Sequence, residues 1–292
     1  MTAIILDGRE MAHRIRAGIA SRVRTLNSRT GVTPNLAVIL VGDDDASKIY
    51  VRKKVRACEE AGIRSSVIEL PASSTTKRVI EVIQRLNEKA DVHGILVQLP
   101  LPPQCDIHAI LPIVSVDKDV DGFHLYNVGG LVVGKTVFPP CTPFGVMRML
   151  DDAGIPIEGR NVTVVGASSI VGKPMALMMI AREATVSICH AKTRDLAQYT
   201  ILADILIVAA GVPNLILPQM VRNGAVVIDV GINRLADGKL VGDVDFEGVR
   251  QKASYISPVP NGVGPMTVTM LLVNTLGAAE RQTDGVKTTS CA

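Results

Sequence analysis

A tyrosine and a lysine one helical turn apart are the residues of this sequence with the clearest capacity for chemistry. Tyr50 and Lys54 lie in residues 46–61, whose pattern predicts a helix that ends at Gly62. On a helix, their side chains share one face. The ring can therefore stack on a flat heterocycle while the amine reaches a reacting carbon.

A lysine that acts as a base near neutral pH needs a pKa about 3 units below its usual value, which corresponds to roughly 4 kcal/mol. Lys54 lies among Arg52, Lys53 and Arg56, and like charges disfavour its protonation. Surface cations alone would not supply this shift, so we expect partial burial and a partner as well. The alternative is a basic helix face in water.

Two polar residues farther along the chain are candidate partners. Gln98 interrupts the apolar run of residues 93–100, which predicts a buried strand, and it is either a site residue or a satisfied amide at a strand end. Asp121 lies in an acidic loop with Asp117 and Asp119. We expect the latter two to serve loop structure or to pair with Lys118.

A glycine turn at Gly166 lies between a predicted strand and a predicted helix, as a dinucleotide-binding turn must. It departs from the usual GxGxxG pattern, because Ser168 stands where a second glycine would be and the next glycine is Gly172. Backbone N–H groups at the start of the following helix would face an anion, and the Ser168 hydroxyl can add a donor. An ordinary strand-to-helix turn is the alternative.

The end of the next predicted strand indicates which dinucleotide would bind. An enzyme that uses NAD has a carboxylate there for the ribose hydroxyls. Here residues 189–194, at the end of the predicted strand, include no acidic residue. Lys192 and Arg194 are cations that would attract a 2′-phosphate. The sequence therefore favours NADP over NAD, unless both cations are simply solvated charges.

Composition and pattern predict the elements that must hold these residues. Apolar residues make up 47% of the 292 residues and aromatic residues only 3%, which suits parallel sheets flanked by helices. Alternating strand and helix patterns predict an α/β fold of two α/β domains. The first covers residues 1–140, completed by a helix at 265–284. The second, 141–264, has a Rossmann-like parallel sheet, with an active-site cleft between the domains.

Charge and cysteine usage exclude several classes of protein. A net charge of +3 is too small to indicate nucleic-acid binding, and no apolar run approaches the ~20 residues that span a membrane. The five cysteines are an odd number without a CxxC pair, so we expect free thiols, no metal site and a cytoplasmic location.

Several segments, taken in order, resemble the methylenetetrahydrofolate dehydrogenase/cyclohydrolase family. They are SKIYVRKKVRACEEAGI, GILVQLPLP, VDKDVDGFH, GASSIVGKPM and SPVPNGVGPMT. The resemblance implies NADP-dependent oxidation of 5,10-methylenetetrahydrofolate to 5,10-methenyltetrahydrofolate. It also implies hydrolysis of that product to 10-formyltetrahydrofolate in one shared site, as part of one-carbon folate metabolism. A homodimer joined through the cofactor domain is implied as well.

The resemblance also assigns roles to residues. Lys54 would be the acid/base group, Tyr50 would pack on the folate, Gln98 would orient the lysine and Asp121 would accept the adjacent N–H donors of the pterin edge. Pro260 and Gly262 would contribute to the substrate site, in a loop where Asn261 replaces a usual glycine; asparagine tolerates positive φ better than most residues. The residues expected to bind the cofactor are Gly166, Ala167, Ser168, Ile170, Val171, Gly172, His190, Ala191, Lys192, Thr193 and Ile232.

Three other readings compete with this one. Another two-domain NADP dehydrogenase, such as one acting on shikimate, would share the fold but would not need Tyr50, Lys54, Gln98 and Asp121 together. A cyclohydrolase that has lost its redox activity would not need an intact Gly166 turn. A non-enzymatic nucleotide-sensing or scaffold protein would need neither set of residues.

Overall fold

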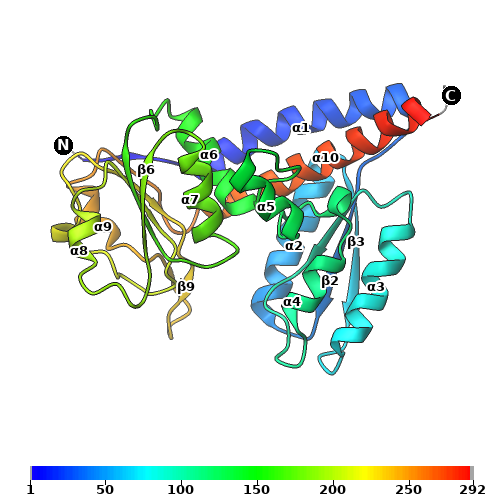
Figure 1. Cartoon of the computed structure of the whole chain (residues 1–292), viewed down its shortest axis with the longest axis horizontal. Coiled ribbons are helices and arrows are strands. Elements are labelled where there is room, and N and C mark those ends of the chain that lie inside the picture. The colour runs from blue at the N-terminus through cyan, green and yellow to red at the C-terminus, as the bar shows by residue number, and fades with distance from the viewer. Residues whose placement is uncertain (1, 290–292) are drawn as a thin grey trace. The chain divides into compact units, whose positions relative to one another are not determined.

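The computed structural model describes residues 2–289 and divides into two compact units (Figure 1). Unit 1 comprises Met1–Ala12 and Thr142–Thr267, and unit 2 comprises His13–Cys141 and Val268–Ala292. The start of the chain thus groups with unit 1, whereas the sequence analysis placed it in the first domain. The physical reason is that β1 (Ile4–Ile5) pairs in parallel with β11 (Tyr255–Ile256).

Unit 2 contains a three-stranded parallel sheet in the order β3-β2-β4. Its strands are β2 (Asn35–Val41), β3 (Arg64–Leu70) and β4 (Gly94–Val97). β2 is buried along its whole length because it lies between the other two strands, whereas β3 is an edge strand and is largely exposed. All three strands were predicted, although β4 is shorter than the predicted residues 93–100.

Helices cover both faces of this sheet, and alternate residues of β2 face different helices. Ala37, Ile39 and Val41 share one apolar core with Val79 and Ile83 of α3. α2 and α3 lie beside β2 and β3 in Figure 1. The helical elements of this part of the chain are α1 (Gly8–Thr30), α2 (Asp45–Ala61), α3 (Thr76–Glu88), α4 (Ile107–Ile110), η1 (Leu111–Ile113), η2 (Val116–Lys118), α5 (Leu125–Val133) and α10 (Val263–Thr289).

Local sequence signals explain where α2 and α3 begin and end. The Asp44 side chain accepts the backbone N–H of Ser47 at 2.7 Å and caps the start of α2. Gly62 ends the helix in the left-handed conformation, with φ of 72°. Thr75 caps α3 by accepting the N–H of Arg78. The predicted helix at 46–61 and its stop at Gly62 are therefore confirmed.

The sequence analysis placed Asp121 in a loop and predicted no helix in the residues that follow it, where the structure has α5. Glycine disfavours helices, and α5 contains both Gly129 and Gly130. At Gly130 a Cβ would lie 2.7 Å from Thr136 Cα, so the glycine permits a close return of the chain. Packing between segments therefore overrides local propensity here.

Unit 1 contains a six-stranded sheet in the order β1-β11-β8-β7-β5-β6, and every strand pair in it is parallel. Its central strands are β5 (Asn161–Val165), β6 (Thr185–Cys189), β7 (Ile205–Val208) and β8 (Val226–Asp229). The chain passes from β5 to β6 in one direction and then returns to β7 on the other side of β5. The carboxyl end of β5 is therefore the topological switch point, where such sheets bind ligands.

The remaining elements of unit 1 are short helices and one hairpin. The helices are α6 (Cys141–Asp152), α7 (Gly172–Ile180), α8 (Ala197–Thr200), η3 (Pro218–Met220) and α9 (Phe246–Arg250). A turn that contains Asp237 and Gly238 joins the antiparallel strands β9 (Asn233–Arg234) and β10 (Leu240–Val241). Within residues 2–289, no helix combines the length and apolar character needed to cross a membrane.

Candidate active site

The amine of Lys54 is held by the side chain that the sequence analysis expected. Lys54 Nζ donates to Gln98 Oε1 at 2.9 Å. Gln98 lies immediately after β4 and is only 8% exposed. Its own Nε2 donates to Leu99 O, which fixes which end of the amide faces the lysine. A lysine on α2 and a glutamine at the carboxyl end of β4 are thus brought together within unit 2.

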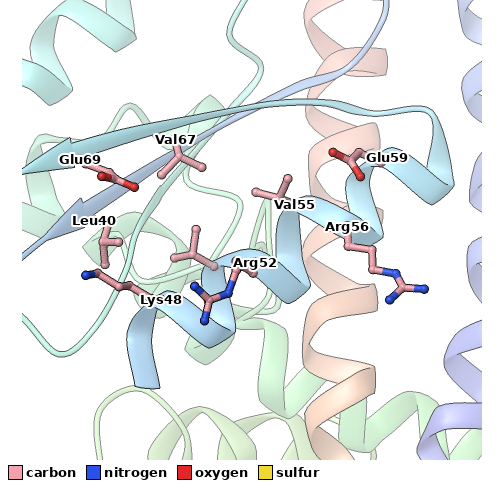
Figure 2. A pocket seen from close by; sticks show the side chains of 9 residues that line it. Leu40, Lys48, Arg52, Val55, Arg56, Glu59, Val67 and Glu69 are labelled. Atoms are coloured by element: carbon pink, nitrogen blue, oxygen red, sulfur yellow. The ribbon is translucent and has the colours of Figure 1, made fainter. Parts of the chain in front are cut away.

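Burial lowers the pKa of Lys54, and the nearby negative charge of Asp121 acts in the opposite direction. The expected contribution of burial is thus confirmed, whereas the neighbouring cations are not among the causes of the shift. Arg52 and Arg56 lie on the part of α2 that faces β3, as Figure 2 shows. The lysine therefore loses its proton more readily because its ammonium form is poorly solvated.

The pocket in Figure 2 is a separate feature of α2. It lies between the helix and the exposed face of β3, and neither Tyr50 nor Lys54 lines it. Its lining combines an apolar floor with charges of both signs: Leu40, Lys48, Val51, Arg52, Val55, Arg56, Glu59, Val67 and Glu69. The face of α2 that lines this pocket is thus distinct from the face that carries Tyr50 and Lys54.

Tyr50 lies one helical turn before Lys54 on α2, as predicted. The ammonium of Lys53 lies 5.8 Å from the centroid of its ring, within the range of a cation–π interaction. Tyr50 is half-buried. Its ring therefore belongs to the same surface of α2 as the lysine.

The segment that carries Asp121 runs beside β4. Asp119 forms a parallel bridge with Ile95, so the chain continues toward the end of β4 where Gln98 lies. Gly122 follows with φ of 77°, and a Cβ there would lie 2.6 Å from Pro140 N. Burial raises the pKa of Asp121 to about 6, against the opposing effect of Lys54. The carboxylate is thus a proton acceptor close to neutrality.

Lys118 and Asp119 hold this segment in place, but not by pairing with each other. The ammonium of Lys118 donates to the carbonyl oxygens of Leu86, Asn87 and Lys89 at the end of α3, at 3.1, 2.8 and 2.7 Å. Asp119 accepts backbone and side-chain N–H groups from Phe123, His124 and Asn127. The expectation that Asp119 serves loop structure is consistent with these bonds.

Two residues that the sequence analysis gave no role also belong to this site. The thiol of Cys141 donates to Val120 O at 3.2 Å, next to Asp121 in the chain, and burial raises its pKa well above the usual value, so it remains a thiol. Asn274 of α10 is 4% exposed and donates to Val120 O at 2.9 Å and Pro139 O at 3.1 Å. An amide in the otherwise apolar run of this helix was the sequence signal that could have identified it.

In unit 1, the glycine turn follows β5 at the switch point of the sheet. Gly166 has φ of 116°, and a Cβ on it would lie 2.1 Å from Ala209 O. A Cβ on Gly172 would lie 1.9 Å from Gly166 O. Both glycines are therefore required by close backbone contacts. Ser168 Oγ accepts N–H groups of Val171 and Gly172 at 3.2 and 3.4 Å, which leaves its hydroxyl proton available.

The residues after β6 form a compact turn beside it. His190 N donates to Thr193 Oγ1 at 3.0 Å, and His190 Nδ1 accepts the N–H of Lys192 at 3.1 Å. The side chains of Lys192 and Arg194 are exposed. Of the other residues expected to bind the cofactor, Ala167, Ile170 and Val171 lie within the glycine turn, Ala191 lies within this second turn, and Ile232 is 45% exposed just after β8.

The loop that contains Pro260 and Gly262 is closely packed. Asn261 adopts a φ of 81°, which confirms that asparagine can occupy a left-handed position where glycine is usual. A Cβ on Gly262 would lie 2.4 Å from Pro258 O, and one on Gly8 would lie 1.8 Å from Gly262 O. The backbone of this loop is therefore closely packed against itself and against Gly8.

Comparison with family models decides the family. The catalytic-domain model of tetrahydrofolate dehydrogenase/cyclohydrolase matches residues 6–121, and the NAD(P)-binding-domain model of the same name matches residues 140–283. The chain belongs to the tetrahydrofolate dehydrogenase/cyclohydrolase family. Membership of this family confirms the predicted enzyme class, a methylenetetrahydrofolate dehydrogenase that is also a methenyltetrahydrofolate cyclohydrolase. The shikimate-type and scaffold readings are thereby set aside.

Relatives within the tetrahydrofolate dehydrogenase/cyclohydrolase family are similar along nearly the whole chain. Bifunctional protein FolD of Nitrosospira multiformis is 57% identical over 281 residues, which is 96% of this chain and 97% of that protein. The crystal structure of the bifunctional enzyme FolD from Campylobacter jejuni has a TM-score of 0.94 at 50% identity, covering 96% of this chain and 99% of that one.

A Trypanosoma brucei methylenetetrahydrofolate dehydrogenase-cyclohydrolase, complexed with NADP cofactor and an inhibitor, also has a TM-score of 0.94. It is 39% identical and covers 96% of this chain and 98% of that one. The predicted fold of two α/β domains is confirmed by these similarities within the family.

Proposed function

We propose that both reactions of this bifunctional enzyme take place at one site, in which the amine of Lys54 handles the protons. The reactions are the NADP-dependent oxidation of 5,10-methylenetetrahydrofolate and the hydrolysis of the methenyl product to 10-formyltetrahydrofolate. The observation that supports the proposal most directly is the 2.9 Å hydrogen bond between Lys54 and Gln98, made where burial lowers the pKa of the lysine.

In the oxidation, the folate supplies the electrons itself. Its two flanking nitrogens stabilise the cation that remains when hydride leaves the methylene bridge, and NADP accepts that hydride. The protein's contribution is then alignment rather than proton transfer. Tyr50 would stack on the folate, and the carboxylate of Asp121 would accept adjacent N–H donors of the pterin edge.

In the hydrolysis, water attacks the methenyl carbon. A neutral Lys54 amine takes a proton as the water adds, the resulting ammonium gives it to the folate nitrogen whose bond to the carbon breaks as the ring opens, and the remaining hydroxyl proton is released to solvent. Such positioned proton transfer contributes about 10²–10⁴-fold in rate. Gln98 accepts a hydrogen bond from the amine and so keeps it directed in both protonation states.

The NADP site would be built mainly from backbone. The close contacts of Gly166 and Gly172 would let the backbone of the turn before α7 approach the pyrophosphate. The exposed cations Lys192 and Arg194 would attract the 2′-phosphate. Pro260 and Gly262 would bring backbone close to the folate and the nicotinamide.

The homodimer is proposed to form through unit 1. β6 is an edge strand of the six-stranded sheet, and only Cys189 of its residues is buried. The apolar side chain of Ile188 on this strand is 44% exposed. An exposed apolar edge strand is a template for pairing with another chain.

A cytoplasmic location would suit Cys58, Cys105, Cys141 and Cys189, which are free thiols, whereas Cys291 lies outside the described residues.

One experiment tests the proposal of a shared site. Purified enzyme is given 5,10-methylenetetrahydrofolate and NADP, and NADPH and the methenyl absorbance are followed together in wild type and in Lys54→Met. We expect the variant to accumulate the methenyl product because hydrolysis is blocked after oxidation. Hydrolysis at the wild-type rate in the variant would refute the role of Lys54.

A further inference from the structure

Unit 1 buries two carboxylates to which the chemistry above gives no role. Asp229 ends β8 and is 3% exposed, and Asp243 follows β10 and is 0% exposed. Buried carboxylates are costly unless they are paired or fully hydrogen-bonded. Neither has a salt bridge among the ion pairs found in the described residues, so hydrogen bonds from N–H groups must stabilise them.

Asp243 binds the loop on which the glycine turn packs. Its Oδ2 accepts the backbone N–H groups of Ala210 and Gly211 at 2.6 and 2.8 Å. The residue before them, Ala209, supplies the carbonyl oxygen that would lie 2.1 Å from a Cβ on Gly166. Asp243 therefore fixes the backbone against which the Gly166 turn closes.

The other oxygen of Asp243 reaches a different segment. Asp243 Oδ1 accepts Nδ2 of Asn233 at 2.8 Å. Asn233 follows Ile232, which was predicted to bind the cofactor. One carboxylate thus joins the loops that follow β7 and β8 at the carboxyl edge of the sheet, where a dinucleotide binds in this fold.

Asp229 holds Asp243 in turn. Its Oδ1 accepts the backbone N–H groups of Gly231 and Asp243, each at 3.0 Å, and its Oδ2 accepts that of Val244 at 3.0 Å. The backbone N–H of Asp229 donates to Ser257 Oγ at 2.8 Å. Ser257 immediately precedes the loop that contains Pro260 and Gly262, so the network reaches that loop as well.

Two glycines make this close arrangement possible. A Cβ on Gly242 would lie 1.8 Å from Asp229 Oδ2, and a Cβ on Gly231 would lie 2.3 Å from the carboxyl group of Asp243. The backbone passes so close to each carboxylate that no side chain fits between them. The local sequence is thus shaped around the two carboxylates.

We propose that Asp243 is a positioning residue for the NADP site, acting through the loop at Ala210 and Gly211, and that Asp229 holds Asp243 in place. The ligand concerned is the dinucleotide, since every segment that Asp243 binds borders residues of the predicted cofactor site. The inference rests on cofactor binding in unit 1. It does not involve Lys54, Gln98 or Asp121, which all lie in unit 2.

This separation provides the test. Hydrolysis of supplied 5,10-methenyltetrahydrofolate consumes no cofactor, so it reports on unit 2 in the same preparation. In Asp243→Ala, which removes every acceptor, we expect the Kd of NADPH and the KM of NADP to rise about tenfold or more, because hydrogen bonds to a buried charged group contribute roughly 1.5–3 kcal/mol. Cyclohydrolase activity should stay near that of wild type. The chain has no Trp, so NADPH fluorescence can be read directly.

Asp243→Asn is the second variant and covers the case in which the alanine variant does not fold. It keeps one carbonyl acceptor for Ala210 and Gly211, so we expect a smaller rise in Kd than in Asp243→Ala. Asp245→Asn is the matched control, because that carboxylate accepts the N–H of Gly248 at the start of α9 and binds neither loop. An unchanged NADPH Kd in the Asp243 variants, or equal losses of both activities, would overturn the proposal. If the wild-type enzyme did not bind NADPH at all, that result would instead contradict the proposed NADP-dependent function.

Discussion

The two units build their candidate sites from different materials. In unit 2, the site consists of side chains, with an amine, an amide, a carboxyl and a thiol contributed by Lys54, Gln98, Asp121 and Cys141. In unit 1, the candidate dinucleotide site is mainly backbone, and its glycines matter because no Cβ fits beside Gly166. A site of side chains can be altered one group at a time, whereas a site of backbone changes when the shape of the chain changes.

The largest effect should come from the side-chain site. Replacing Lys54 by Met removes the proposed acid–base group, and we expect the cyclohydrolase kcat to fall about 10³-fold. Arg56→Met removes a cation from the same helix, where the arginine pairs with Glu60 on the surface at 3.0 Å, and such pairs contribute little. Hydrolysis of the methenyl substrate is measured for both variants. Equal cyclohydrolase activities in the two variants would show that the Lys54 amine has no role beyond that of any cation on α2.

The second test concerns the backbone site. In Gly166→Ala, the new methyl group would meet Ala209 O and force the turn to move. We expect dehydrogenase kcat/KM to fall about 10²-fold, as misplacement by about 1 Å can do, while cyclohydrolase activity is retained. Gly224→Ala is the control, since Gly224 also has positive φ, 78°, but no atom within 4 Å of its Cβ position. A normal dehydrogenase in Gly166→Ala would contradict the contrast between the units.

A third test uses pH to separate the two sites. Because burial raises the pKa of Asp121 to about 6, the carboxylate becomes protonated as pH falls below that value and loses acceptors for the pterin. We expect the KM for folate to rise by up to about tenfold per pH unit below the pKa, with the KM for NADP changing less. In Asp121→Asn the folate KM should be high and independent of pH in this range. A wild-type folate KM that stayed constant through this interval would argue against the pterin contact.

The smallest effect is expected at the edge of the dinucleotide site. Lys192→Ala and Arg194→Ala each remove one exposed cation, so we expect the KM for NADP to rise by several-fold to about tenfold, in keeping with about 1 kcal/mol for a partly exposed charged contact. The KM for NAD should not change, because NAD has no 2′-phosphate. Steady-state kinetics with both cofactors decides this. Parallel changes with NAD and NADP would mean that the cations do not distinguish them.

Elements of the fold could be predicted from the sequence where the pattern lay within one segment, but not where they depend on pairing between distant segments. The helix that carries Tyr50 and Lys54 was readable from its spacing and from Gly62 at its end. Strands β1 and β11 have only two residues each, too few for a pattern, and their pairing joins distant parts of the chain. The sequence therefore could not show that the first residues of the chain group with unit 1.

The site itself was predictable to a similar extent. Lys54 and Gln98 were expected to meet, and they do. Cys141 was read only as one thiol among five, because its hydrogen bond with Val120 O depends on how the chain returns after α5. Burial of Lys54 was expected from the size of the shift that a base needs, but its extent depends on three-dimensional packing, which the sequence does not give.

The division of the chain has a consequence for its synthesis. Unit 2 is interrupted by unit 1 and is completed only by the segment from Val268 onward. That segment includes Asn274, which binds the carbonyl oxygens of Val120 and Pro139 on either side of the stretch that begins with Asp121. Chains leave the ribosome from the amino end, and domains fold as they emerge. On a nascent chain, the sheet of unit 1 can therefore form before the loop that carries Asp121 receives the hydrogen bonds from Asn274.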